Sequence, residues 1–197
     1  MSKIDITSTI AEKGIESVQN FLGKLLGPAA TEVGFLLADK VRFYRFNNQI
    51  KIFSKVKERV EKNNLTLKQV SLKTIIPLLD FSSLEDNETL QEKWINLTVN
   101  FIDANQKYGS TIFPYLLNQL TSEEVQILDN MYNDFLINNY STLKINGIIK
   151  SNLIRLGLVE TVVSKRLMKR LSIIKLGSEN RVIMTDLGKE FVKCCSS

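Results

Sequence analysis

Residues 173–195 read IIKLGSENRVIMTDLGKEFVKCC, and this stretch decides the fold class of the C-terminal part of the chain. Two short β-like runs, Leu171–Leu176 and Arg181–Met184, flank the turn sequence GSEN at residues 177–180. Thr185 and Asp186 follow at once, and both are residue types that begin helices. The stretch therefore predicts a β-hairpin followed by one last helix.

The residues before the hairpin predict more helix and a further strand. Thr121 and Glu124 have the spacing of a capping box, which begins a helix. A second helix passes through Leu153 and ends at Gly157, and residues 158–163 can form a strand. Helices followed by a two-stranded wing are typical of a winged-helix module, so we expect residues 119–197 to form a winged-helix-like domain.

Residues 1–118 predict a helical region that contains a long helix. Apolar residues recur at helical spacing over residues 8–26, and Pro28 suits the first turn of a helix that runs to about Lys62. Ser82 and Glu85 signal a later helix start, and that helix carries a core stripe of Leu90, Trp94, Leu97 and Phe101. The predicted fold class is mainly α: an N-terminal helical bundle with a long helix, then the winged-helix-like unit with a small β-hairpin.

The composition argues against most catalytic chemistry. The chain of 197 residues has no His, which removes the commonest general base and the Ser-His and Cys-His nucleophile pairs. Its only thiols, Cys194 and Cys195, are adjacent, so they form neither a disulfide framework nor a spaced zinc site. No phosphate-binding glycine motif occurs. We expect no enzyme activity, no catalytic residue, no cofactor and no metal. The thiols and the polar N-terminus favour the cytoplasm.

The charge of the chain is uneven. Residues 64–149 are acidic overall, whereas residues 150–197 are basic overall. A basic end can attract nucleic acid or an acidic protein, and Lys, Arg and Asn on an exposed helix could read a groove while a basic wing holds phosphates. The candidate contacts are Lys150, Asn152, Arg155, Lys165, Arg166, Lys169, Arg170, Lys175 and Arg181. A solvated basic face without such a role has the same appearance.

Two features of the N-terminal region suggest association. Ala30, Gly34 and Ala38 repeat every four residues, a spacing that lets helices approach closely, so they form a candidate self-association seam. Tight packing inside one chain would give the same pattern. The amphipathic, lysine-containing residues 8–26 also resemble an interfacial helix, which makes a membrane surface an alternative partner.

Three segments carry a resemblance to a known family: residues 27–52 (GPAATEVGFLLADKVRFYRFNNQIKI), residues 75–100 (IIPLLDFSSLEDNETLQEKWINLTVN) and residues 185–195 (TDLGKEFVKCC). In this order they resemble the abortive-infection alpha family over roughly residues 10–195. The resemblance implies a bacterial protein of phage defence and brings no catalytic residues. We therefore expect a non-enzymatic defence protein that binds a protein partner or self-associates. The alternatives are a nucleic-acid-binding winged-helix regulator and a membrane-surface effector.

Overall fold

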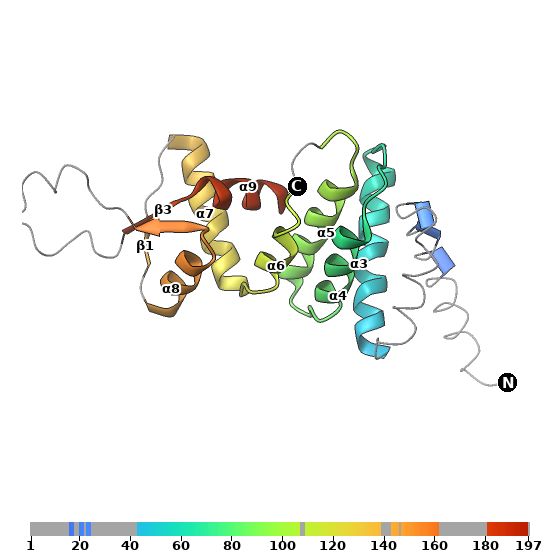
Figure 1. The fold of residues 1–197 in the computed structure, drawn as a ribbon, viewed down its shortest axis with the longest axis horizontal. Coiled ribbons are helices and arrows are strands. Elements are labelled where there is room, and N and C mark those ends of the chain that lie inside the picture. The colour runs from blue at the N-terminus through green and yellow to red at the C-terminus, as the bar shows by residue number, and fades with distance from the viewer. Residues whose placement is uncertain are drawn as a thin grey trace, which may run out of the picture. The chain divides into compact units, whose positions relative to one another are not determined.

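The computed structural model describes residues 16–17, 20–21, 23–24, 43–106, 109–138, 143–145, 147–161 and 181–196. Residues 1–119 group with residues 194–197 into one compact unit, unit 1, and residues 120–193 form unit 2. The described elements are mostly helices, with one small sheet (Figure 1). The predicted fold class, mainly α with a small β element, is confirmed.

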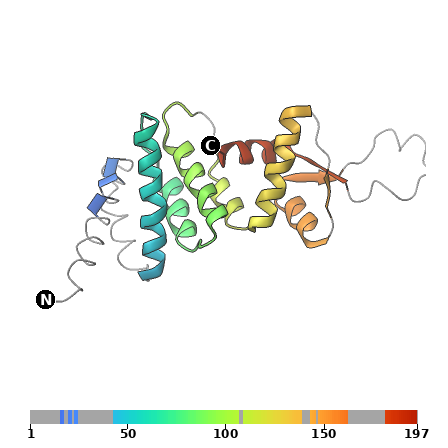
Figure 2. The ribbon, with the colours of Figure 1, turned by 180° about the vertical axis from the view of Figure 1, so that it is seen from behind.

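Unit 1 contains α3 (Phe43–Lys62), α4 (Leu72–Ser82), α5 (Glu88–Ile102) and α6 (Phe113–Leu117), together with the helical residues 16–17, 20–21 and 23–24. Helix α3 packs against α4 and α5, and α6 packs against α4 and α5, as the ribbon shows from both sides (Figures 1 and 2). The predicted stripe of Leu90, Trp94, Leu97 and Phe101 is buried, so the helical spacing placed this core correctly.

The start of α5 differs from the prediction. Ser82 is the last residue of α4 and is fully buried, and the N-cap of α5 is Asn87, whose side chain accepts a hydrogen bond from the Leu90 backbone. Glu85 supports this cap, since its carboxylate accepts a hydrogen bond from the Asn87 backbone at 2.9 Å. The predicted Ser82–Glu85 capping box is wrong because α4 continues to Ser82 and leaves the cap to Asn87.

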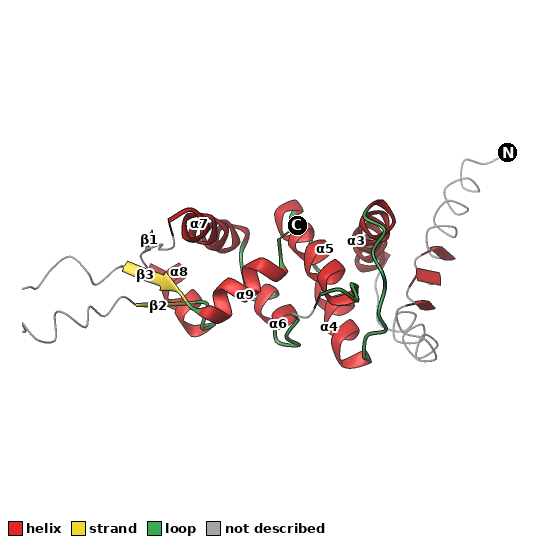
Figure 3. Cartoon of the chain, turned by 90° about the horizontal axis from the view of Figure 1, so that it is seen from above, coloured by secondary structure: helices red, strands yellow, loops and turns green. Residues whose placement is uncertain are grey.

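Unit 2 contains α7 (Ser122–Asn138), β1 (Leu143–Lys144), α8 (Gly147–Arg155), β2 (Val159–Thr161), β3 (Arg181–Met184) and α9 (Asp186–Cys194). The strands form an antiparallel sheet in the order β1-β3-β2, in which Leu143 pairs with Val182 and Val159 with Met184 (Figure 3). The described neighbours of β3 are thus β1 and β2. The run predicted to pair with it, residues 171–176, lies outside the described residues.

The ends of the unit 2 helices follow the sequence signals. The capping box of α7 forms, since the Thr121 backbone donates to the Glu124 carboxylate at 2.8 Å and the Glu124 backbone donates to the Thr121 hydroxyl at 3.3 Å. Gly157 has φ +71° and ends α8, as predicted. Thr185 caps α9 by accepting from the Gly188 backbone at 3.0 Å. These hydrogen bonds satisfy backbone groups that a helix end leaves open.

The winged-helix detail stays a prediction. A helix-turn-helix joins its two helices by a turn of about three or four residues. In the described part of unit 2, α7 ends at Asn138, β1 follows, and α8 alone lies between β1 and β2.

Candidate binding sites

The predicted basic contacts fall partly on α8 and β3 of unit 2. Arg155 and Arg181 are exposed, while Lys150 is half-buried. Five of the candidates, Lys165, Arg166, Lys169, Arg170 and Lys175, lie outside the described residues. The candidate seam of Ala30, Gly34 and Ala38 also lies outside them. The contact of any of these residues with nucleic acid, an acidic partner or a second copy stays a prediction.

Asn152 takes part in a hydrogen-bond network within unit 2. Its amide donates to the Glu124 carboxylate at 2.8 Å, and the Arg155 guanidinium donates to its amide oxygen at 2.7 Å. Glu124 is buried, and the same side chain completes the α7 capping box with Thr121. The network holds α8 against the start of α7. A contact from Asn152 to a base would therefore have to replace these hydrogen bonds, which raises its cost.

A polar ladder along α5, which the sequence analysis missed, holds the last residues of the chain in unit 1. Arg59 of α3 donates to both Glu92 and Asn96. Asn96 donates to the Cys195 carbonyl at 3.2 Å, and Asn100 donates to the Cys194 carbonyl at 2.8 Å. Glu92, Asn96 and Asn100 are four residues apart, which is the signal that places them on one helix face. A pocket of about 370 Å³ adjoins the ladder.

A second polar joint connects the first two family-like segments. The Arg45 guanidinium lies 2.8 Å from the Asp80 carboxylate and donates to the Ser83 hydroxyl at 2.9 Å. Asn48 and Gln49 donate to the carbonyls of Ser83 and Leu79 at the end of α4. These side chains therefore add hydrogen bonds to carbonyls at the end of α4, where a helix runs out of backbone partners.

An apolar patch, the α4–α6 patch, lies where α4 meets α6 in unit 1. It consists of Phe81, Leu84, Ile112 and Tyr115. The rings of Phe81 and Tyr115 meet edge to face at 5.2 Å between centroids. The Leu84 backbone donates to the Phe81 carbonyl, and Ile112 lies one helical turn before Tyr115. About half of the side chains of Leu84, Ile112 and Tyr115 is exposed.

The surroundings of the patch are acidic. Asp80, Glu85, Asp86 and Glu88 lie within the same stretch, and no Lys or Arg occurs between Lys73 and Lys93 or between Lys107 and Lys144. Burial, with the neighbouring charge of Asp86, raises the pKa of Glu85 above its usual value, although the hydrogen bond from the Asn87 backbone opposes the shift. The Arg45 guanidinium is paired with the Asp80 carboxylate.

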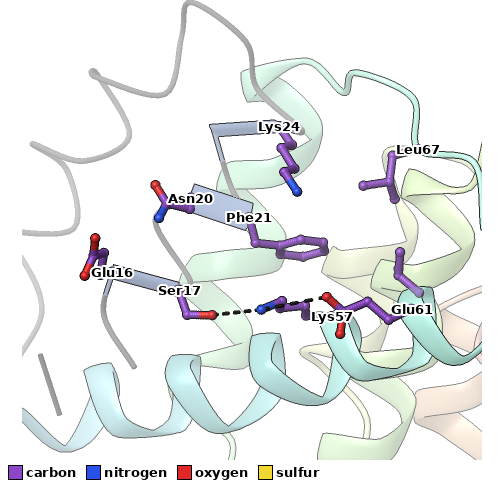
Figure 4. Close-up of a pocket in the computed structure, with 9 residues that line it drawn as sticks. Glu16, Ser17, Asn20, Phe21, Lys24, Lys57, Glu61 and Leu67 are labelled. Carbon is purple, nitrogen blue, oxygen red and sulfur yellow. Dashed lines mark hydrogen bonds and ion pairs between the residues drawn. The ribbon is translucent and has the colours of Figure 1, made fainter. Parts of the chain in front are cut away.

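A pocket of about 360 Å³ lies between α3 and the described N-terminal residues of unit 1 (Figure 4). Residues 16–17, 20–21 and 23–24 are helical. Five of these residues, Glu16, Ser17, Asn20, Phe21 and Lys24, line the pocket together with residues of α3 and Leu67. The pocket thus has an apolar interior around the Phe21 ring and charged groups at its edge (Figure 4).

The described residues contain no group of three or more His, Cys, Asp or Glu side chains placed to hold a metal ion. None of the described helices is long and apolar enough to cross a membrane.

The comparisons with known proteins give one match. A family model described as abortive infection alpha matches residues 40–195. No curated protein and no solved structure matches the chain.

Proposed function

Because the chain belongs to the abortive infection alpha family, we propose that it serves abortive infection as a non-enzymatic protein that binds a protein partner. The partner contacts the α4–α6 patch through a segment that carries Lys or Arg beside Leu, Ile or Phe side chains. Family membership supports the biological role, and the patch supports binding as the molecular act.

The observation that carries this proposal is the combination of exposed apolar surface and unbalanced negative charge. Leu84, Ile112 and Tyr115 present apolar surface around the Phe81–Tyr115 ring contact. Exposed apolar groups that adjoin one another mark interaction sites more often than scattered ones do. The acidic residues beside them favour a cationic partner and disfavour an acidic one, because complementary charge steers association.

The use of polar residues in the family-like segments supports a binding role. Arg45, Asn48 and Gln49 bind α4, and Arg59, Asn96 and Asn100 bind each other or the chain end. These groups stabilise helix ends and helix contacts. Arg59, Asn96 and Asn100 also line the pocket of about 370 Å³, where they bind Glu92 and the chain end.

The single tryptophan offers a direct test. Trp94 is buried behind Phe81, with ring centroids 6.5 Å apart, so a ligand on the patch should change its emission. We expect a Trp-free amphipathic peptide of Lys and Leu to produce a saturable change. A Glu/Leu peptide of equal length should not. Leu84→Ser should weaken binding about fivefold, since it removes roughly half of a Leu side chain's apolar burial.

Ile137→Ser is the matched control, because Ile137 is an exposed apolar side chain of α7 in unit 2. Equal loss of peptide binding in both variants, or no binding by either peptide, would refute the patch as the docking surface. In infected cultures, Leu84→Ser should lower phage protection and Ile137→Ser should preserve it. Protection that survives Leu84→Ser would contradict the proposed role of the patch.

Nucleic-acid binding is the second candidate function. The exposed Arg155 and Arg181 of unit 2 favour it, together with the basic sequence between them. Phosphate contacts release counterions, so affinity for DNA or RNA should fall steeply with salt. Changing Lys165, Arg166, Lys169 and Arg170 to Glu should abolish that binding. No affinity at low salt would refute this alternative.

Self-association is the remaining form of protein binding. The spacing of Ala30, Gly34 and Ala38 supports it. Gly34→Leu should then lower the mass measured in solution by light scattering, because a bulky side chain separates the helices. A wild-type chain that is already a monomer would remove the hypothesis.

A further inference from the structure

The pocket beside α3 combines an apolar interior with a polar edge. Phe21 and Val60 are largely buried and Leu67 is half-buried, and all three line the cavity. The volume of about 360 Å³ corresponds to about a dozen water molecules at ~30 Å³ each. This lies within the size range of small-molecule sites, which are mostly apolar with a few fixed polar groups.

The charges at the edge are distributed unevenly. Lys57 donates to the Ser17 hydroxyl at 3.1 Å and lies 3.8 Å from the Glu61 carboxylate, so these two opposite charges offset each other. Lys24 forms no ion pair with any residue that the structure describes. Figure 4 shows Glu16 and Lys24 at opposite ends of the N-terminal residues that line the pocket. The Lys24 end of the pocket is therefore positive.

The apolar and positive parts are adjacent. Figure 4 shows the Lys24 and Leu67 side chains on the same side of the Phe21 ring. A ligand that enters from the Lys24 end would meet the ring and Leu67 with its apolar part. Its charged group would stay at the ammonium, near solvent. Such a division of contacts selects molecules with one polar end and one apolar end.

We propose that this pocket binds a small amphiphile with an anionic head group and an aliphatic tail. The tail packs on Phe21, Val60 and Leu67, and the head group pairs with Lys24. A soluble fatty acid and the acyl chain of an anionic lipid share this chemistry. The site is independent of the α4–α6 patch, which lies on other residues of unit 1.

The test uses the full chain and decanoate carrying a photoreactive diazirine. Cross-links should map by mass spectrometry to peptides within residues 16–24 and 57–67, and excess plain decanoate should compete. Lys24→Gln should weaken decanoate binding about fivefold, as the loss of one partly exposed ion pair predicts. Lys51→Gln is the matched control, because Lys51 is an exposed lysine of α3 that does not line the pocket.

Three comparisons decide the outcome. Decylamine should bind more weakly than decanoate, since it places a cation beside Lys24. If the chain sediments with anionic vesicles but does not bind free decanoate, the ligand is a lipid. In that case Lys24→Gln should abolish sedimentation with the vesicles, and Lys51→Gln should not. The proposal is overturned if neither decanoate nor anionic vesicles bind. It is also overturned if both Lys variants behave alike or the cross-links lie elsewhere.

Discussion

A Cβ atom on Gly188 would lie 2.2 Å from the carbonyl oxygen of Leu158. The first turn of α9 therefore packs directly on the backbone that leads from α8 into β2. Thr185 secures the same joint, because its hydroxyl donates to the Gly157 carbonyl at 2.6 Å and accepts from the Gly188 backbone at 3.0 Å. The sequence Thr-Asp-x-Gly thus combines a helix cap with a close backbone approach.

Gly188→Ala should destabilise unit 2 by about 3 kcal/mol, because the added methyl group meets backbone that cannot move aside. Chemical denaturation followed by circular dichroism measures the change. Gly23→Ala is the control: Gly23 is helical and has no atom within 4 Å of an added Cβ, so Ala should be neutral or stabilising there. If Gly188→Ala were as stable as wild type, the backbone at Leu158 would have to shift at little cost in free energy.

Thr185→Val should cost about 1–2 kcal/mol of unfolding free energy, since it removes the hydroxyl while keeping the branched shape. Thr185→Ser keeps the hydroxyl and should restore most of that loss. The two variants should separate in thermal melts recorded side by side. If Ser were more destabilising than Val, the methyl group rather than the cap would hold the joint.

The features that the sequence predicted are those with local causes. The Thr121–Glu124 box, the Gly157 helix end and the Thr185 cap each depend on residues within a few positions of one another. The buried stripe that contains Trp94 needed only helical periodicity. Such signals can be recognised in the sequence without knowing which residues pack against the helix.

The features that the sequence missed depend on distant partners. Asn96 donates a hydrogen bond to Cys195, which is 99 positions away, and no local sequence pattern predicts that pairing. Ser82 has the right spacing to Glu85, yet it is buried at the end of α4, and that end is set by packing against α3. The described partners of β3 likewise come from residues 143–144 and 159–161, well before it in the sequence.

Asn96→Ala should destabilise unit 1 by about 2 kcal/mol, because it leaves Arg59 with one partner fewer and removes the donor to the Cys195 carbonyl. Hydrogen exchange at the chain end should rise in the same variant. Asn105→Ala, an exposed loop change, should leave both readings near wild type. Unchanged exchange at residues 194–196 would mean that the chain end is retained without Asn96.

Glu85→Gln should stabilise unit 1 at neutral pH. The folded-state pKa of Glu85 is raised, so the folded chain holds this proton more tightly than the unfolded chain does. Stability from the protonated form is therefore present at low pH, and it is lost as the pH rises through the raised pKa. Gln removes that loss, and its amide oxygen can still accept from the Asn87 backbone.

The pH profile of the melting temperature tests this sign. The gain of Glu85→Gln over wild type should be largest at neutral pH and should vanish below pH about 4, near the ordinary Glu pKa, where Glu85 is protonated in the folded and unfolded chain. Glu58→Gln, at an exposed position of α3, is the control for removing one carboxylate from unit 1. A gain that grew toward acid pH would mean that Glu85 stabilises the fold as a carboxylate, with the Asn87 hydrogen bond outweighing burial.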